Sequence, residues 1–522
     1  MEKHNLLIVS DLHLSEGLNP ETAKFSNLED FLFDDAFARF LRYHEEAKEQ
    51  PDFGGRPWTL ILNGDLLDFL QVVSLPGKGR LLQAVKGLDS PQSLSRNERD
   101  YGLGTTAEES EWKLGRIARG HQRFFAALGW FVARGNRVAV VKGNHDVEFY
   151  WPQVRERFVK EVKRAYARER LTLDPDLAVA PADLGARIHF YPWFYHEPGR
   201  VYVEHGGQYE AVNHFRDYVN PVLPDDPKRI ELPWGSLFVR YVLNEVEDEH
   251  PFADNVKPAS RYLGWAFEND PIGTIELVVA RGYLLLRAYW NILLKRASSA
   301  LRAQRGQGQS QGTTHGSLPP DVTREIEALA KRRVDAVWLE WVGATIRGLL
   351  SASMILIITT FLVLAGLTLV EDLSWTTAVY LGAAVLGYFL RRGLKRSFDY
   401  ILESDYLLGV ARELNLILKP DHAVRYLVFG HSHRVAIEKL GKQTWYVNTG
   451  AWVPVYAQEG PIEGRETLTF FRLAWGAQRP AGTAALGRRS GRARARGVAR
   501  GKLTTRSQPG CDRPASACTP WA

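Results

Sequence analysis

Five short polar motifs, in one order along the chain, limit most strongly what this sequence can fold into. They are Asp11-Leu12-His13, Gly64-Asp65, Gly143-Asn144-His145-Asp146, His205-Gly206 and Gly430-His431-Ser432-His433. Each follows a short apolar run that predicts a β-strand, namely Leu6–Ser10, Trp58–Leu62, Arg137–Lys142, Arg200–Glu204 and Tyr426–Phe429. Because residues just past the carboxyl ends of strands converge in one crevice of an α/β sheet, we expect the five motifs to meet.

The residue types in these motifs predict a site for two divalent metal ions. Carboxylate and imidazole ligands are typical of Mn, Fe or Zn, whereas Mg seldom recruits so many histidines. A thiolate site is excluded because the only two cysteines, Cys511 and Cys518, lie near the end of the chain. Two ions about 3.5–4 Å apart can acidify water and clamp the attacking and leaving oxygens of a phosphate ester.

The ordered motifs resemble those of the calcineurin-like metallophosphoesterase family, in which D-x-H, G-D, G-N-H-D, a lone H and G-H-x-H follow one another. The resemblance covers about residues 6–215 and 426–452. It implies an α/β sandwich of two mixed β-sheets flanked by helices. It also implies hydrolysis of phosphoric esters by metal-activated hydroxide.

The resemblance further implies a role for each motif residue. The predicted metal ligands form two sets and a bridge: Asp11, His13 and His433 for one ion, Asn144, His205 and His431 for the other, and Asp65 between them. His145 would lie over the phosphate and protonate the leaving group or stabilise the transition state, with Asp146 orienting its ring.

Single residues of this set also have ordinary structural explanations. Asp65 and Asn144 stand beside glycines and are typical of turns, and His205 alone would suggest a structural histidine. The complete, ordered set favours a metal site instead. Two further residues stay outside the predicted site: Asp68, which either caps a helix or bonds a ligand histidine, and His214, which lies in a polar stretch.

A second feature separates the fourth motif from the fifth. Gly348–Val370 runs 23 residues without a charge, and Leu373–Leu390 runs 18. Such lengths match the hydrocarbon thickness of a bilayer. Basic residues flank the pair on both sides: Lys331, Arg332, Arg333 and Arg347 before it, and Arg391, Arg392, Lys395 and Arg396 after it. This pattern predicts an inserted transmembrane helical hairpin with both ends in the cytoplasm.

Topology supports an even number of spans, because His205 and His431 must reach one site from either side of the hairpin. We therefore expect a two-span protein of the cell inner membrane or plasma membrane, with a cytoplasmic catalytic domain. The alternative is a buried helical hairpin in a soluble protein, since the second run is short. No cleavable signal peptide is expected, because the chain begins without a basic segment followed by an apolar one.

Composition and motif positions predict five regions along the 522 residues. Residues 1–220 would form the core with motifs one to four, 221–346 a helical insert with a flexible linker at 302–320, and 347–396 the hairpin. Residues 397–475 would complete the core with motif five and closing strands. Residues 476–522 would be a disordered Arg-rich tail. The stretch 479–522 carries ten basic residues and one acidic residue, a net charge of +9, whereas the whole chain carries +6. The rest of the chain is therefore near neutral at −3, and no nucleic-acid partner is expected.

The predicted partners are a phosphorylated substrate and membrane lipids. Membrane attachment favours a lipid-linked phosphate or diphosphate. The chain is also similar to bacterial UDP-2,3-diacylglucosamine hydrolases, which usually have arginine where this chain has His145, and to which the hairpin is foreign. Two alternatives stay open: a phosphodiesterase or phosphatase that acts on a soluble nucleotide or a phosphoprotein, and a non-catalytic membrane scaffold.

Overall fold

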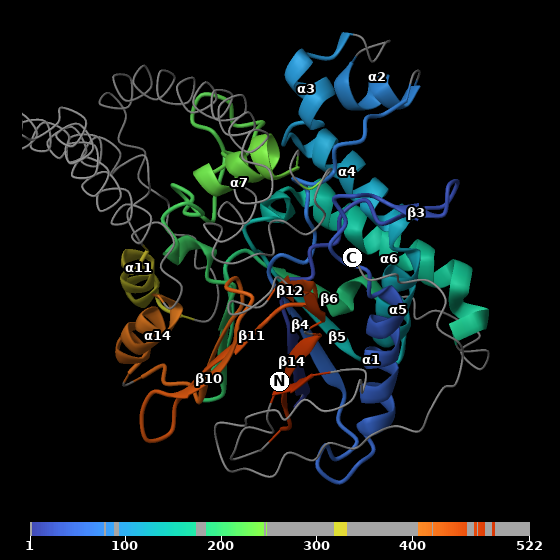
Figure 1. Cartoon of the computed structure of the whole chain (residues 1–522). Coiled ribbons are helices and arrows are strands. Elements are labelled where there is room, and N and C mark those ends of the chain that lie inside the picture. Colours follow the sequence, from blue (N-terminus) through green and yellow to red (C-terminus); the bar gives the residue numbers. More distant parts are fainter. Residues whose placement is uncertain are drawn as a thin grey trace, which may run out of the picture. The chain divides into compact units, whose positions relative to one another are not determined.

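Two mixed β-sheets form the centre of the computed structural model (Figure 1). The larger has the order β15-β14-β1-β4-β5-β6. Strands β1, β4, β5 and β6 are parallel to one another. Strand β14 is antiparallel to β1, and β15 is antiparallel to β14. The bounds are β1 Asn5–Val9, β4 Trp58–Asn63, β5 Arg137–Val141, β6 Ile188–Tyr191, β14 Thr469–Leu473 and β15 Thr483–Ala485.

The smaller sheet has the order β10-β11-β9-β8-β7, in which β8, β9 and β11 are parallel and the two edge strands antiparallel. Its strands are β7 Phe194–Glu197, β8 Val201–Glu204, β9 Tyr426–Phe429, β10 Val435–Lys439 and β11 Trp445–Thr449. Two short antiparallel pairs complete the strands: β2 Leu18–Asn19 with β3 Lys24–Phe25, and β12 Pro454–Tyr456 with β13 Gly464–Glu466.

Strand β1 shows how the layers are built, because all five of its residues are buried. Leu7 and Val9 belong to an apolar cluster with side chains of helices α1 (Asp34–Ala47) and α5 (Gln122–Ala133). Leu6 and Ile8 point the opposite way and belong to a cluster with Val203 of the second sheet. A strand covered on both faces has no polar alternation. The predicted sandwich of two mixed sheets flanked by helices is confirmed.

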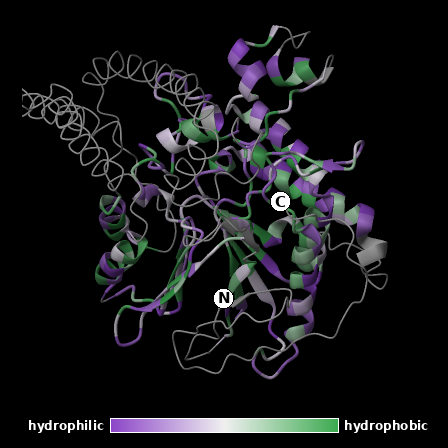
Figure 2. Cartoon of the chain, in the orientation of Figure 1, coloured by the Kyte–Doolittle hydropathy of each residue, from purple (hydrophilic) through white to green (hydrophobic). Residues whose placement is uncertain are grey.

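Helices cover the outer face of each sheet. The larger sheet packs against α1 and α5 and also against α4 Ala107–Gly120 and α6 Pro152–Leu173. The smaller sheet packs against α14 Tyr406–Ile417 and α11 Pro320–Ala328. The remaining helical segments are α2 Arg80–Lys86, α3 Arg96–Tyr101, η2 Val147–Tyr150, η3 Leu184–Arg187, η4 Gly207–Tyr209, α7 Trp234–Phe238 and η5 Val239–Leu243. Hydrophobic residues follow the central strands, while the helices show both hydrophilic and hydrophobic residues (Figure 2).

The structure describes residues 3–77, 80–87, 93–173, 184–244, 247, 318–330, 406–419, 421–456, 464–466, 468–475 and 483–485. The chain divides into two compact units, Met1–Leu486 and Gly487–Ala522, and the second contains none of these residues. Among the described residues, no helix is long and apolar enough to cross a membrane. The predicted spans, Gly348–Val370 and Leu373–Leu390, fall outside them, as do the linker up to residue 317 and the Arg-rich tail.

All five predicted strands are present, with bounds within one residue of those expected. Because β1, β4 and β5 are parallel neighbours, the first three motifs, which follow these strands, lie together at the carboxyl ends of the strands of the larger sheet. Because β8 and β9 are parallel neighbours in the smaller sheet, the fourth and fifth motifs do likewise. The topology therefore brings together motifs that are up to 420 residues apart, as the hydrogen bond from the His431 N–H to Asp11 shows.

Candidate metal centre

The backbone conformation marks the predicted ligands. Among the described residues, seven non-glycine residues have positive φ, and five of these are Asp11, His13, Asp65, His431 and His433, with φ between 48° and 65°. Residues with a Cβ atom rarely adopt this conformation, which costs about 1–3 kcal/mol each in such sparsely populated regions. The fold therefore accepts backbone strain at the positions from which these side chains project.

Main-chain hydrogen bonds tie the first two motifs together. The carbonyl oxygen of Asp65 accepts the N–H groups of Leu12 and His13, both at 2.9 Å, and the Gly64 carbonyl accepts the N–H of Asp11 at 3.2 Å. The turns that follow β1 and β4 therefore form one rigid unit. This unit holds three strained ligand positions against one another.

Glycines in the motifs provide space for neighbouring ligands. A Cβ atom on Gly143 would lie 2.2 Å from the Asp65 carboxylate, and one on Gly64 would lie 2.4 Å from the His205 ring. Both distances are far shorter than van der Waals contact, so no side chain fits. The glycines beside Asp65 and Asn144 are therefore needed for close approach as well as for turning the chain.

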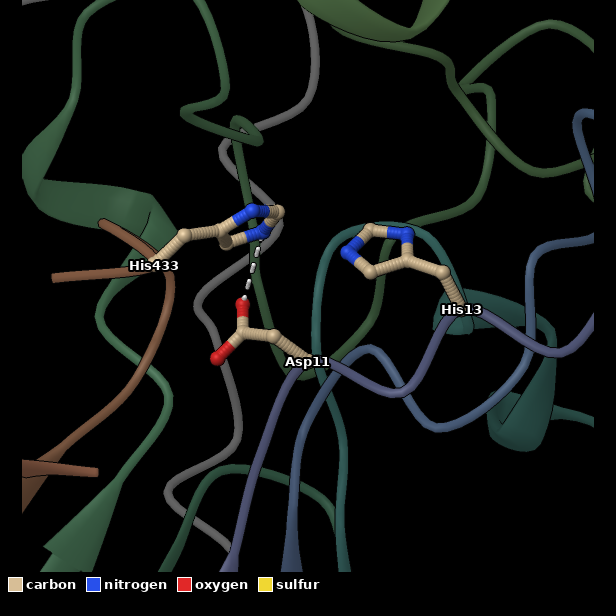
Figure 3. A group of neighbouring side chains, drawn as sticks. All are labelled: Asp11, His13 and His433. Carbon is tan, nitrogen blue, oxygen red and sulfur yellow. Dashed lines mark ion pairs between the residues drawn. The ribbon is translucent and has the colours of Figure 1, made fainter. Parts of the chain in front are cut away.

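The first candidate ion site contains Asp11, His13 and His433. One potential ligand atom of each lies within 4.8 Å of the others. Asp11 Oδ1 is 3.3 Å from His433 Nε2, and the two imidazole rings are 5.2 Å apart between centroids. Figure 3 shows these rings on either side of the Asp11 carboxylate.

The second candidate site contains Asp65, His205 and His431, again with one potential ligand atom of each within 4.8 Å of the others. His205 Nε2 lies 3.0 Å from Asp65 Oδ2 and 3.1 Å from Asn144 Oδ1. The structure therefore brings the four residues predicted for this site and the bridge into one place.

Asp65 also takes part in a third group, with His13 and His145. Its Oδ2 is 3.0 Å from His205 Nε2 on one side and 3.8 Å from His13 Nε2 on the other. The same oxygen thus faces a predicted ligand of each ion. This position is the one that a bridging carboxylate requires.

The donor set fits two divalent transition-metal ions. His13 is buried, and its Nε2 has no hydrogen-bond partner among the described residues. A buried imidazole nitrogen without a partner is unfavourable, and ligation of a metal ion would satisfy it. Carboxylates and imidazoles together suit Mn, Fe or Zn. None of the three donor groups includes His214.

Asp68 joins His145 to the first site. Its Oδ2 lies 2.6 Å from His145 Nδ1 and 3.2 Å from His13 Nδ1, so one carboxylate fixes the orientation of both rings. Its Oδ1 accepts the backbone N–H groups of Leu70 and Gln71. Although burial acts to raise the pKa of Asp68, the nearby histidines hold it well below its usual range. Asp68 is therefore the partner of a predicted ligand histidine, and the alternative that it caps a helix is wrong: a bend follows it, and the next helix that the structure describes begins at Arg80.

The expectation that Asp146 orients the His145 ring is wrong. The two Asp146 oxygens accept backbone N–H groups instead, from Gly143 at 2.6 Å and from Leu66 at 2.8 Å. Asp146 thus joins the turns of the second and third motifs. Burial and the charge of Asp65 raise the pKa of Asp146 to about 7.

Glu210 was not singled out from the sequence, yet its Oε2 lies 2.7 Å from Nε2 of His431. It stands five residues after His205, at the end of η4. The available sequence signal is an acidic residue one short turn beyond a predicted ligand. This signal is weak because acidic residues are common in loops.

The charges of the centre favour ionised carboxylates. Although burial opposes it, the hydrogen bond and charge of His433 lower the pKa of Asp11 to about 2. The histidines around Asp65 likewise hold its pKa well below the usual range despite burial. Burial acts to lower the pKa of His205, but the charge of Asp65 outweighs it and raises this pKa to about 9. Without metal, His205 is therefore protonated at neutral pH.

Metal binding should consequently release a proton. Ligation needs neutral imidazole, so an ion that enters beside His205 displaces its proton at any pH below about 9. We expect the apparent affinity of that ion to rise about tenfold per pH unit near neutrality. Calorimetry of Mn²⁺ binding in buffers of different ionisation enthalpy measures the protons released. The His205→Asn variant should release one proton fewer, and equal release by both proteins would contradict the assignment.

Comparison with known proteins agrees with this geometry. The family model described as calcineurin-like phosphoesterase matches residues 4–282, which is more than half of the chain. No curated protein matches the chain. The matched range includes the first four motifs, and the fold places the fifth beside them. This chain belongs to the calcineurin-like phosphoesterase family and is a metal-dependent phosphoric ester hydrolase.

Proposed function

We propose that this protein is a membrane-anchored, two-metal phosphoesterase that acts on a lipid-linked phosphate or diphosphate. Hydrolysis of a phosphoric ester follows from the family. The observation that carries the two-metal assignment is that Oδ2 of Asp65 lies 3.0 Å from Nε2 of His205 and 3.8 Å from Nε2 of His13, so it faces a predicted ligand of each ion. A purely structural carboxylate has no need of imidazoles on two sides.

When bound, the two ions would acidify a water molecule and neutralise charge on the phosphate oxygens. Asp11, His13 and His433 would hold one ion, and Asn144, His205 and His431 the other. Asp65 would hold both and keep them at a fixed separation. Its own position is fixed because Oδ1 accepts the N–H of His145 at 2.9 Å.

In the proposed reaction, His145 moves a proton. Its side chain is 14% exposed, more than those of His13, His205, His431 and His433 at 4%, 0%, 8% and 7%, which supports contact with a substrate. Asp68 accepts a hydrogen bond from the Nδ1–H group, which leaves Nε2 as the nitrogen that would donate a proton to the leaving oxygen. The Asp68 carboxylate would also stabilise the doubly protonated imidazolium, which is the form of His145 that donates a proton from Nε2.

The described residues on either side of the predicted hairpin support an anchor at one face of the fold. Ile326 of α11 and Ala411 of α14 belong to one apolar cluster, although residues 329–405 separate the two helices. The described elements on either side of the two charge-free runs are therefore neighbours. A pair of spans between them returns the chain to its starting side, as the two charge-free runs and their basic flanks predict.

Anchoring next to a bilayer favours a substrate held in the same membrane, because confinement raises its effective concentration at the site. Purified protein with Mn²⁺ should be offered an aryl phosphate, an aryl phosphodiester, a nucleotide and a lipid diphosphate in detergent. We expect the lipid diphosphate to be hydrolysed fastest. Faster hydrolysis of the soluble nucleotide would contradict the proposed substrate class and leave the hydrolase assignment intact.

Substitution of His145 tests the acid role. His145→Ala should lower turnover about 10²–10⁴-fold, which is the usual contribution of a general acid. The bound metal should stay at the wild-type amount. The loss should be smaller for esters with good leaving groups, which need less protonation. His189→Ala, on the exposed side of β6, is the matched control and should change neither quantity. Loss of metal from the His145 variant would contradict the role.

Deletion of the hairpin tests the anchor. Replacement of residues 347–396 by a short flexible linker removes no predicted ligand, so the protein should leave the membrane and keep its activity on small aryl phosphates. Its activity on the lipid substrate should fall further, because surface attachment is lost. Sedimentation and paired assays measure these changes. A deletion variant that still pellets with membranes would contradict the anchor.

Cysteine labelling tests the predicted orientation. Both native cysteines, Cys511 and Cys518, should first be replaced by serine. A cysteine at Asp372, between the two runs, should then react with an impermeant thiol reagent from outside intact cells. A cysteine at the exposed Glu49 of the catalytic fold should react only after lysis. Labelling of the Glu49 position in intact cells would contradict the orientation.

A further inference from the structure

The turn after β8 supplies more than one group to the second ion site. His205 begins it, η4 follows at Gly207–Tyr209, and Glu210 ends it. Gly206 has a φ of 106°, and a Cβ atom on Gly207 would lie 2.5 Å from Asn144 Oδ1. Both glycines are therefore required for the chain to pass this close to the site.

A buried carboxylate fixes the course of this turn. Glu204 is fully buried and accepts hydrogen bonds from the side chains of four residues: Trp193, Tyr202, Gln208 and Tyr209. Two of these donors, Gln208 and Tyr209, belong to η4 itself. The residue that follows them, Glu210, is thereby delivered to a defined place beside the fifth motif.

At that place the Glu210 carboxylate contacts a predicted metal ligand. Its Oε2 is 2.7 Å from Nε2 of His431 and also accepts a hydrogen bond from Nδ2 of Asn213 at 2.7 Å. Glu210 belongs to none of the donor groups among the described residues, so its carboxylate lies outside the predicted ligand set. A histidine whose Nε2–H donates to a carboxylate presents Nδ1 to a metal ion. Such outer carboxylates orient the ring and increase its basicity.

We propose that Glu210 is a positioning residue for the second ion site, which orients His431 and strengthens its bond to that ion while the first site is left unaffected. One turn would thus contribute twice to the same ion, once through His205 and once through the partner of His431. This inference rests on the proposed two-metal site.

Metal titration of the metal-free full-length protein tests the proposal without an activity assay. Wild type should bind two Mn²⁺ ions. Glu210→Gln keeps the size of the side chain and removes its charge. It should lower the affinity for one ion about 10–100-fold, the usual effect of losing a residue that hydrogen-bonds a metal ligand. Glu197→Gln is the matched control. Glu197 pairs with Arg200 at the end of the β7–β8 strand pair that lies away from His205, so its substitution should leave the affinities for both Mn²⁺ ions unchanged.

Background variants identify which ion is affected. In a His433→Ala background, where the second site remains, Glu210→Gln should lower the affinity for the remaining ion about 10–100-fold. In a His205→Ala background it should have no effect on the remaining ion. Equal weakening in both backgrounds, or two ions bound by Glu210→Gln with wild-type affinity, would overturn the proposal. A wild-type protein that binds no stoichiometric metal would overturn the two-metal site itself.

Two further measurements separate positioning from other roles. The visible spectrum of the Co²⁺-loaded protein should keep the same coordination number in Glu210→Gln, and loss of a ligand would show direct coordination instead. The thermal unfolding of the metal-free variant should match that of wild type. If Glu210→Gln does not fold, Asn213→Ala removes a hydrogen bond to the carboxylate and should weaken the same ion to a smaller extent. Wild-type affinity in Asn213→Ala would then overturn the proposal.

Discussion

The contacts of one buried carboxylate, Asp65, hold this centre together. Its main-chain carbonyl binds the first motif, Oδ1 accepts the N–H of His145, and Oδ2 faces both His205 and His13. Gly143 leaves the space that this carboxylate occupies. Three motifs from three strands are therefore positioned by one residue, and removal of its charge would leave several buried histidines without their anionic partner.

Without bound metal, this arrangement lowers the free energy of unfolding. Five ligand positions have positive φ, and ionised carboxylates are buried beside imidazoles. Unfavourable conformations of this kind persist where the surrounding structure enforces them and function requires them. Ions that bind the folded chain and not the unfolded chain offset part of the cost, because binding free energy then adds to stability. The two-sheet sandwich is the rigid frame that makes such a centre possible.

Much of the fold could be predicted because β1 and its neighbours are covered on both faces, which produces short continuous apolar runs such as Leu6–Val9. The ligand set followed from the order of the motifs at strand ends. The exchange of roles between Asp68 and Asp146 could not, since it depends on how two loops fold against each other. Glu210 likewise depends on the turn that Glu204 fixes. The membrane spans remain a prediction from charge and length.

The most direct test of the account is a crystal structure of the full-length protein loaded with Mn²⁺, with anomalous data collected at the manganese edge. The account predicts two peaks about 3.5–4 Å apart, with the Asp65 carboxylate in contact with both. One peak should lie among Asp11, His13 and His433, and the other among Asn144, His205 and His431. A single peak, or a pair of peaks that Asp65 does not bridge, would contradict it.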